Sequence, residues 1–178
     1  RRGAGRGEEG LRCRRREAVL EPCARATEGR VTWGHGSFGH VVEAERSGDP
    51  GIRDLRHSAA YVPRAVGDDN RFDWGDDTAP QIPWAETVIY ETHVRNLTKR
   101  HPEIPERLRG TYAGMAHPAT ITHLRALGVT SVELLPVHAF SHEPALVQRG
   151  LLNHWGYNTL GFSAPQAAYA ASSDPQGG

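Results

Sequence analysis

The hydrophobic and polar positions between residues 87 and 136 alternate in two short runs that predict β-strands. The first run covers residues 87–94, and the second covers residues 129–135 and ends at Pro136, which cannot donate to a sheet ladder. The second run carries apolar side chains on both faces. Such a strand is usually covered on both sides, as in the parallel sheets of α/β proteins.

A helix is predicted between the two strands. Pro118 suits its first turn, where the missing N–H costs nothing. Ile121, Leu124 and Leu127 recur at the spacing of a buried helical stripe, and Gly128 is a helix stop. The order is strand, polar loop, helix, strand. This βαβ unit predicts two parallel strands joined by a right-handed crossover.

Composition divides the chain into four parts. Residues 1–16 are mostly Arg, Gly and Glu, which predicts a disordered tail. Residues 17–86 hold isolated aromatics without a sustained period, which predicts a linker wrapping over a neighbouring surface. Residues 87–166 hold the βαβ unit, with a long loop predicted at 95–114. Residues 167–178 are small and polar, and we expect them to have no order of their own.

One βαβ unit leaves the outer edges of both strands without partners. We therefore expect further strands of the same fold outside the 178 residues, and we interpret the chain as truncated at its C-terminal end. The first residue is Arg1 rather than Met, which indicates either a processed chain or a fragment.

Charge and composition narrow the classes of function. The formal net charge is zero, whereas a nucleic-acid binder normally presents a basic face. The sequence lacks the long apolar run of a membrane span.

The cysteines and histidines point to no special chemistry. Cys13 and Cys23 are too few for a disulfide framework, and because cytosolic thiols stay reduced, we expect a cytoplasmic protein. The ten histidines form no metal-binding pattern, and Asp76 and Asp77 offer too few oxygen ligands for a hard cation. We expect no metal and no cofactor.

Six stretches of the chain resemble, in order and spacing, the isoamylase-type glycogen-debranching enzymes of the α-amylase superfamily. They are GLRC (10–13), NRFDWGDD (70–77), PWAETVIYETHV (83–94), HPEIPERLRGTYAGMAHP (101–118), GVTSVELLPVHAF (128–140) and NHWGYNTLGFSAP (153–165). The resemblance is nearly continuous from Asn70 to Pro165 and looser before it.

This resemblance implies an α/β fold, a (β/α)8 TIM barrel preceded by a carbohydrate-binding β-sandwich. The chain would hold the first two strands and the first helix of that barrel, after the linker from a missing β-sandwich. The implied activity is hydrolysis of α-1,6-glucosidic branch points of glycogen with retention, through a covalent glycosyl-enzyme. The implied catalytic aspartates and glutamate lie on later strands, beyond Gly178, so no catalytic residue is assigned.

Two other hypotheses stay open at this point. The chain is either part of such a hydrolase or a non-catalytic remnant that binds α-glucans. Within the enzyme class, a glucan-branching enzyme or a trehalose-releasing relative is the alternative. The extended stretch at residues 101–118 favours debranching.

Glu91 and Glu133 form a tempting pair of carboxylates, because alternation points both to one face of neighbouring strands. Retaining glycosidases need two carboxyl groups about 5–5.5 Å apart. Barrels, however, place catalysis at the C-terminal ends of strands, and these two residues lie mid-strand. We interpret them as buried polar groups that meet partners from absent strands.

The loop after Pro136 holds the candidate sugar-binding residues, because barrel loops at strand C-terminal ends carry the ligand site. Trp155 and Tyr157 offer flat faces to the apolar C–H patches of sugar rings, and Gly156 allows a tight path between them. The resemblance implies that Tyr157 is the platform for the sugar at the cleavage point. Otherwise both rings are ordinary loop anchors.

Three further residues, Asn153, His138 and His93, have two open interpretations each. Asn153 and His138 either donate hydrogen bonds to sugar hydroxyls or hold the loop in place. His93, at the end of the first strand, either joins the site or braces it. Tyr112 is predicted to pack the long loop that precedes the helix. A short strand is expected at residues 160–164.

Overall fold

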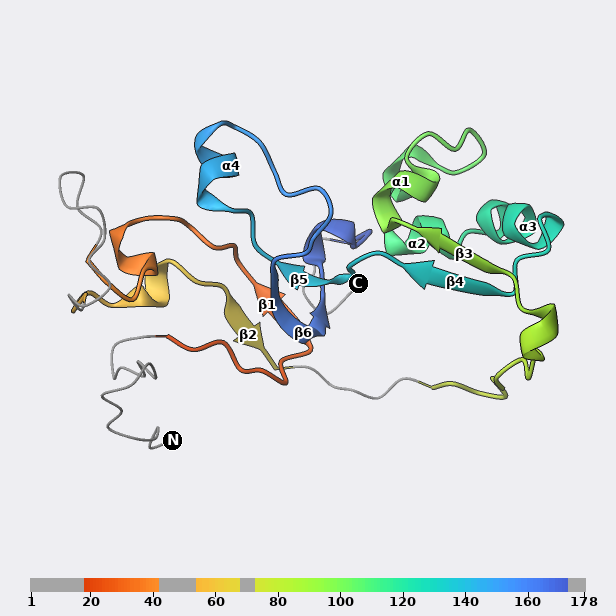
Figure 1. Ribbon diagram of the computed structural model, residues 1–178, viewed down its shortest axis with the longest axis horizontal. Helices are drawn as coiled ribbons and strands as arrows, with labels where there is room; N and C mark the ends of the chain where they lie inside the picture. The colour runs from red at the N-terminus through yellow and green to blue at the C-terminus, as the bar shows by residue number, and fades with distance from the viewer. Residues whose placement is uncertain (1–17, 42–53, 68–72, 173–178) are drawn as a thin grey trace.

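The structure is a computed structural model that describes residues 18–41, 54–67 and 73–172. Within these ranges the chain forms three two-stranded sheets and several short helices. In Figure 1, β3 and β4 lie with α1, α2 and α3 at one end of the molecule, while the other two sheets lie near its middle. The tail predicted at residues 1–16 lies outside the described residues.

Strands β3 (Ile89–Thr92) and β4 (Ser131–Leu134) are parallel and hydrogen-bonded to each other. Their register pairs Glu91 with Glu133. The prediction of two parallel strands from the βαβ pattern is therefore confirmed.

Helix α3 (Pro118–Ala126) connects the two strands and begins as predicted, with Pro118 in its first turn. The preceding His117 caps it, because its Nδ1 accepts a hydrogen bond from the N–H of Ala119 at 3.2 Å. Gly128 ends the helical segment with a φ of +77°, a left-handed conformation that glycine adopts without a Cβ clash.

The loop predicted at residues 95–114 is wrong, because this stretch is partly helical. It contains α1 (Val94–Thr98), a 3-10 turn (Glu106–Leu108) and α2 (Tyr112–Met115). Each of these elements spans five residues or fewer, which is too short for a helical period to show in the sequence.

Side-chain caps begin both short α-helices. Nδ1 of His93 accepts from the N–H of Arg95 at 3.1 Å, and Oγ1 of Thr111 accepts an N–H three residues later at 3.1 Å. Thr98 is fully buried at the end of α1, where its Oγ1 accepts from the N–H of Gly110 at 2.8 Å. Hydrogen bonds from polar side chains therefore hold this region, together with the buried side chains of Val94 and Ile104.

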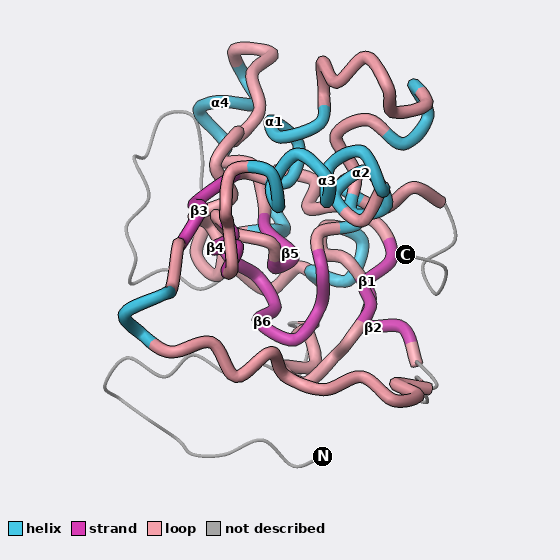
Figure 2. The backbone as a smooth tube through the Cα atoms, turned by 90° about the vertical axis from the view of Figure 1, so that its right-hand side faces the viewer, coloured by secondary structure: helices cyan, strands magenta, loops and turns pink. Residues whose placement is uncertain are grey.

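The predicted buried stripe of α3 is only partly correct. Leu124 is buried, but Ile121 and Leu127 are exposed, and the polar Thr120 takes the second buried position. Oγ1 of Thr120 donates to the carbonyl oxygen of Gly114 at 2.8 Å, so α3 turns this side towards α2. Figure 2 shows α1, α2 and α3 grouped together beside the strands.

The prediction that the second strand is covered on both faces is also wrong for the described residues. All four residues of β4 are exposed, including Val132 and Leu134. The helices lie against the face of β3 that carries Tyr90 and Thr92, which are half-buried, whereas Ile89 and Glu91 on the opposite face are exposed.

Strands β5 (His138–Phe140) and β6 (Thr159–Pro165) form an antiparallel pair with an irregular register. The strand expected at residues 160–164 is confirmed and is slightly longer. The loop predicted after Pro136 also contains β5 and α4 (Pro144–Gln148). Short elements of this kind are again below the length at which periodicity shows.

The stretch predicted as a wrapping linker contains its own strand pair. β1 (Ala26–Glu28) runs antiparallel to β2 (Arg64–Val66), and β1 contacts β6. The indole N–H of Trp33 donates to the carbonyl oxygen of His142 at 2.5 Å.

In the described part of the chain, no helix has the length and the apolar character that crossing a bilayer requires.

Candidate functional site

The candidate site is a pocket of about 320 Å³ at the place where β4 leads into β5. Glu91 and Glu133 line it from the two parallel strands, and His138 and Tyr157 line it from the segment that follows. The loop that follows β4 therefore contributes residues to this pocket. Part of that loop thus lies beside the sheet face that the helices leave open.

Trp155 and Tyr157 both extend from the loop into solvent, with 52% and 71% of their surface exposed. Gly156 between them is buried and has a φ of +81°. A Cβ at this position would lie 2.9 Å from the ring of Phe140 and 3.3 Å from Cβ of Pro136. The glycine thus lets the backbone lie flat on Phe140 and Pro136 while the aromatic rings on either side point outward.

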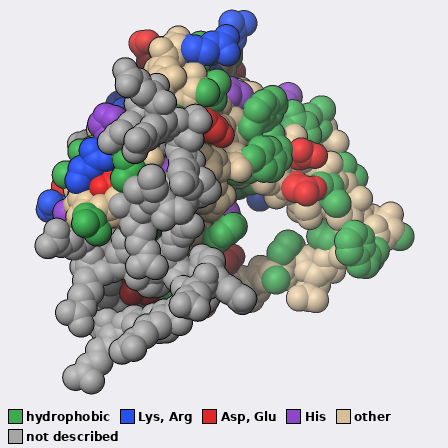
Figure 3. All heavy atoms as spheres, turned by 60° about the vertical axis from the view of Figure 1, so that its left-hand side comes forward, with side chains coloured by type: hydrophobic (Ala, Val, Ile, Leu, Met, Phe, Trp, Pro, Cys, Tyr) green, Lys and Arg blue, Asp and Glu red, His purple; other side chains and the backbone are tan. Residues whose placement is uncertain are grey.

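Phe162 on β6 is a pocket residue that the sequence analysis missed. It is 74% exposed, lines the same pocket as Tyr157, and its ring lies 5.8 Å from that of His138. Its signal in the sequence is a large aromatic residue between the small Gly161 and Ser163 in an expected strand. In the space-filling view, hydrophobic side chains gather on the surface with acidic side chains beside them (Figure 3).

Asn153 uses its side chain within the loop. Its amide nitrogen donates to Oε1 of Glu143 at 2.8 Å, and its Oδ1 accepts from the N–H of Gly156 at 2.8 Å. Its own N–H donates to Nδ1 of His142 at 3.1 Å. Of the two interpretations that the sequence left open, these contacts correspond to holding the loop. His138 differs, because its half-buried ring lines the pocket.

His93 is buried beneath the loop at the end of β3. Its Nε2 lies 2.9 Å from the carbonyl oxygen of His154 and 3.0 Å from the hydroxyl oxygen of Tyr169. The rings of His93 and His154 are stacked, with centroids 4.7 Å apart. Burial lowers the pKa of His93 and outweighs the hydrogen bond to His154, which acts in the opposite direction. Of the two interpretations left open for His93, these contacts correspond to supporting the loop from below.

Two tyrosines complete the support beneath the loop. The hydroxyl of Tyr112 contacts the carbonyl oxygens of Val137 at 3.0 Å and Gln166 at 3.3 Å, and burial raises its pKa to about 12. Tyr112 therefore joins α2 to β5 and β6, beyond the loop packing predicted for it. Tyr169, only 4% exposed, packs edge-on against His93 and Tyr112. It lies in the tail for which we expected no order, and its one sequence signal is an aromatic residue among small ones.

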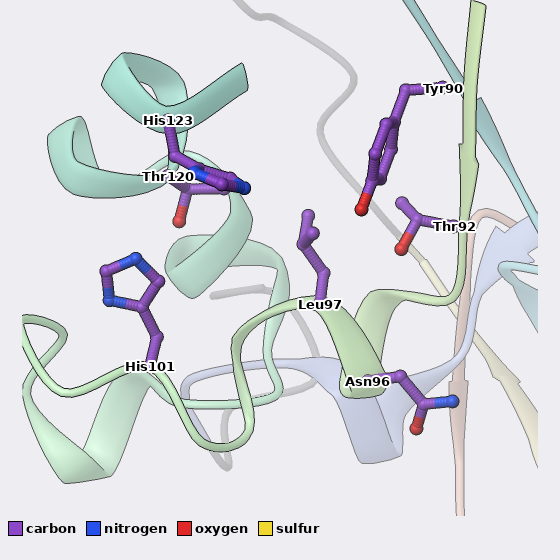
Figure 4. A pocket seen from close by; sticks show the side chains of 7 residues that line it. All are labelled: Tyr90, Thr92, Asn96, Leu97, His101, Thr120 and His123. Atoms are coloured by element: carbon purple, nitrogen blue, oxygen red, sulfur yellow. The ribbon is translucent and has the colours of Figure 1, made fainter. Parts of the chain in front are cut away.

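A second pocket, of about 340 Å³, lies on the helix-covered side of β3 and is drawn in Figure 4. Most of its side chains are polar, and Leu97 projects into the middle of the group. It is lined by Tyr90, Thr92, Asn96, Leu97, His101, Thr120 and His123. Neither this pocket nor any other place in the described residues gathers three or more side chains that could hold a metal ion.

Comparison with known proteins decides the family. No protein-family model matches the chain. Glycogen debranching enzyme from Erwinia tasmaniensis is 43% identical over 174 residues, which cover 98% of this chain and 25% of that protein. Glycogen debranching enzyme from Cronobacter sakazakii is 45% identical over 168 residues, which cover 94% and 24% of the two proteins. By sequence, the chain is a homologue of the glycogen debranching enzymes. The resemblance inferred from the sequence motifs is thereby confirmed.

The homologous region spans about a quarter of these debranching enzymes. A further relative, the glycogen operon protein GlgX homolog of Mycobacterium tuberculosis, is 44% identical over 165 residues, covering 92% of this chain and 22% of that protein. Among solved structures, pullulanase type I from Bacillus subtilis complexed with maltose has 28% identity and a TM-score of 0.49, over 64% of this chain and 17% of that chain.

In this debranching-enzyme homologue, Glu91 and Glu133 do not have the burial that the sequence predicted. Both are exposed on the open face of the sheet, and both line the pocket with Tyr157. They are register partners, and each is the third of the four residues of its strand, one residue before the C-terminal end rather than in the middle as the sequence predicted. No catalytic role is assigned to either carboxylate.

Proposed function

We propose that this chain is part of a glycoside hydrolase that cleaves α-1,6-glucosidic branch points of glycogen or related α-glucans with retention. In this proposal the chain supplies part of a sugar subsite and none of the catalytic carboxylates. The observation that carries it is the pocket in which Tyr157, Phe162 and His138 meet after β4, in a chain 43–45% identical to glycogen debranching enzymes.

We propose further that β3, α3 and β4 are the first two strands and the first helix of a (β/α)8 barrel. The parallel register of β3 and β4 supports this, as does the position of the pocket beyond the end of β4. Glu91 and Glu133 would then point into the barrel interior. The cytoplasmic location expected from the sequence stays a prediction.

The chemistry of the pocket suits a sugar ring. Tyr157 offers an exposed aromatic face on which the C–H groups of a glucose unit can stack, and Phe162 offers a second apolar surface in the same pocket. His138 would hydrogen-bond a sugar hydroxyl from the side. Asn153 would act indirectly, because it holds the N–H of Gly156, next to Tyr157. Trp155 would extend the stacking surface along the loop.

Retention on glycogen tests the sugar subsite. Affinity electrophoresis of the 178-residue chain through glycogen-containing gels should show clear retardation, and Tyr157→Ala should weaken the affinity about tenfold, or ~1.4 kcal/mol. Trp84→Ala is the matched control, because Trp84 is 86% exposed but does not line the pocket. Equal retardation of wild type and Tyr157→Ala would remove the basis for this subsite.

The absence of catalytic carboxylates is tested separately. The purified 178-residue chain should release no reducing ends from glycogen. A turnover that persists through purification and is lost in Glu91→Gln or Glu133→Gln would place the catalytic pair on β3 and β4 and overturn this part of the proposal.

A non-catalytic α-glucan-binding protein is the second candidate. The observation in its favour is that the exposed aromatic residues at 155, 157 and 162 occur without an assigned acid–base pair in the described residues. Reading the coding DNA beyond Gly178 separates the two candidates. The hydrolase hypothesis expects one more helix and then a strand that carries an aspartate.

A further inference from the structure

His93 stands at the junction between the first parallel strand and the loop that carries Trp155 and Tyr157. It directly follows β3, and the residue is 3% exposed. None of its contacts depends on a sugar. The contacts nevertheless reach the backbone of His154, immediately before the two exposed aromatic residues.

The hydrogen bonds around the ring define its tautomer. Nδ1 accepts from the N–H of Arg95 at 3.1 Å, so Nδ1 carries a lone pair and the proton is on Nε2. The Nε2–H group then donates towards the carbonyl oxygen of His154 at 2.9 Å, with the hydroxyl oxygen of Tyr169 at 3.0 Å as a second acceptor. One imidazole thus caps α1 with one nitrogen and holds the loop with the other.

Ring packing adds orientation to this hydrogen bond. The imidazole of His154 stacks on His93 with an interplanar angle of 10°, and the indole of Trp155 meets both imidazoles edge-on, at centroid distances of 6.1 Å from His93 and 5.2 Å from His154. The loop backbone at His154 and the indole of Trp155 therefore both contact the buried imidazole of His93.

We propose that His93 is a positioning residue for glucan binding, because it sets the orientation of residues 154–157 and with it the rings of Trp155 and Tyr157. The proposal rests on the proposed sugar subsite. The competing explanation is that His93 serves only as the cap of α1.

Two substitutions separate these roles, because each keeps one half of the imidazole. The amide of His93→Asn reaches the position of Nδ1, so it keeps the helix cap and loses the bond to His154. The longer amide of His93→Gln reaches the position of Nε2, so it keeps a donor for His154 and loses the cap. A role as cap alone predicts that Asn is tolerated and Gln is not.

The positioning role predicts the opposite order. In affinity electrophoresis, His93→Asn should bind glycogen about fivefold more weakly than wild type, and His93→Gln should stay within about twofold. In ¹H–¹⁵N spectra, the amides of residues 154–157 and the indole N–H of Trp155 should shift in His93→Asn and return towards wild-type positions in His93→Gln. Unshifted loop amides in a folded His93→Asn, or Gln behaving like Asn, would overturn the proposal.

The spectra also separate this inference from the proposed function. Wild-type protein that does not bind glycogen would refute the sugar subsite, while the loop amides would still decide whether His93 positions the loop. Tyr169→Phe covers the case in which His93→Asn does not fold. It removes the competing acceptor and leaves the imidazole, so the bond from the Nε2–H group to the carbonyl oxygen of His154 should strengthen and shift the amides of residues 154 and 155. Unshifted amides there would count against the proposal.

Discussion

The hydroxyl group of Tyr112 donates a hydrogen bond to the carbonyl oxygen of Val137 across 3.0 Å. The hydroxyl oxygen of Tyr112 also accepts a hydrogen bond from the backbone N–H of Gln166 at 3.1 Å. A single side chain from α2 is therefore hydrogen-bonded to the residue before β5 and to the residue after β6. This link joins the helical end of the molecule to the sheet that supports the candidate site.

Removing this hydroxyl should destabilise the protein. Tyr112→Phe leaves the ring in place and removes one donor and one acceptor, so the free energy of unfolding should fall by about 1 kcal/mol. Urea denaturation followed by circular dichroism measures it. Tyr157→Phe is the control, since the hydroxyl of Tyr157 is on an exposed side chain and its loss should leave the midpoint unchanged. A midpoint that is the same for Tyr112→Phe and wild type would contradict the linking role.

Gly156→Ala should be more costly than an ordinary substitution at a left-handed glycine. Gly156 combines a φ of +81° with the close approach to Phe140, whereas Gly150 has a φ of +69° and open space around it. We expect a loss of about 1–2 kcal/mol for Gly150→Ala, from backbone strain alone. Gly156→Ala should lose roughly 1–3 kcal/mol more, because the ring of Phe140 must move. Equal urea midpoints for the two variants would show that the close approach to Phe140 does not add to the loss of folding free energy.

Thr98→Val should destabilise the protein more than Thr98→Ser. The valine keeps the buried volume but leaves the N–H of Gly110 without its 2.8 Å acceptor, at a cost of about 1–3 kcal/mol. The serine keeps the acceptor and loses one methyl group, at a cost of about 1 kcal/mol. Thermal unfolding of the two variants measures the order. The reverse order would mean that packing of the methyl group, rather than the hydrogen bond, holds this position.

Acid should weaken the fold in part through His93. Burial lowers its pKa, so below about pH 6.5 the unfolded chain binds a proton that the folded chain resists. The stability from this group is fully present above that pH and is lost as the pH falls towards the folded-state pKa. His154, Arg95 and Tyr169 face the ring, and the positive charges of the first two disfavour its protonation, whereas the carbonyl oxygen of His154 favours it.

Urea midpoints at about pH 5 and pH 7.5 test this linkage. Wild type should lose more stability between the two values than His93→Gln, which has no titrating group at this position. The other histidines remain in both proteins, so the difference between the two slopes isolates His93. Identical slopes would mean that His93 does not contribute to the pH dependence.

The parallel strand pair could be predicted from the sequence because its signals are local. Pro118, Gly128 and Pro136 mark the start of the helix, its end and the end of the second strand, and the structure has α3 and β4 between those limits. The alternation in β3 and β4 also gave the correct common face for Glu91 and Glu133.

The remaining elements depend on distant contacts that no local pattern records. β1 pairs with β2 across a gap of more than thirty residues. Tyr169 is buried because His93 and Tyr112, far from it in the chain, pack against its ring. The face of α3 with Ile121 and Leu127 looks like a core stripe, yet it stays exposed because the helix turns Thr120 towards Gly114.

In the candidate site, the sequence predicted the aromatic pair and its place after a strand, but not its support. Tyr157 and His138 line one pocket, and Phe162 joins them from a strand that was predicted without a role. Asn153 forms its hydrogen bonds within the loop, and their partners Glu143 and His142 could not be inferred from spacing alone.

The two parallel strands have a consequence for handling the isolated chain. Within the described residues, β3 and β4 pair only with each other, and Ile89, Val132 and Leu134 beside these open backbone edges are exposed. Unpaired edges flanked by apolar side chains are templates for strands of other molecules. Purified chains should therefore self-associate as their concentration rises, with growing light scattering and β-rich circular dichroism, long before heat unfolds the helices.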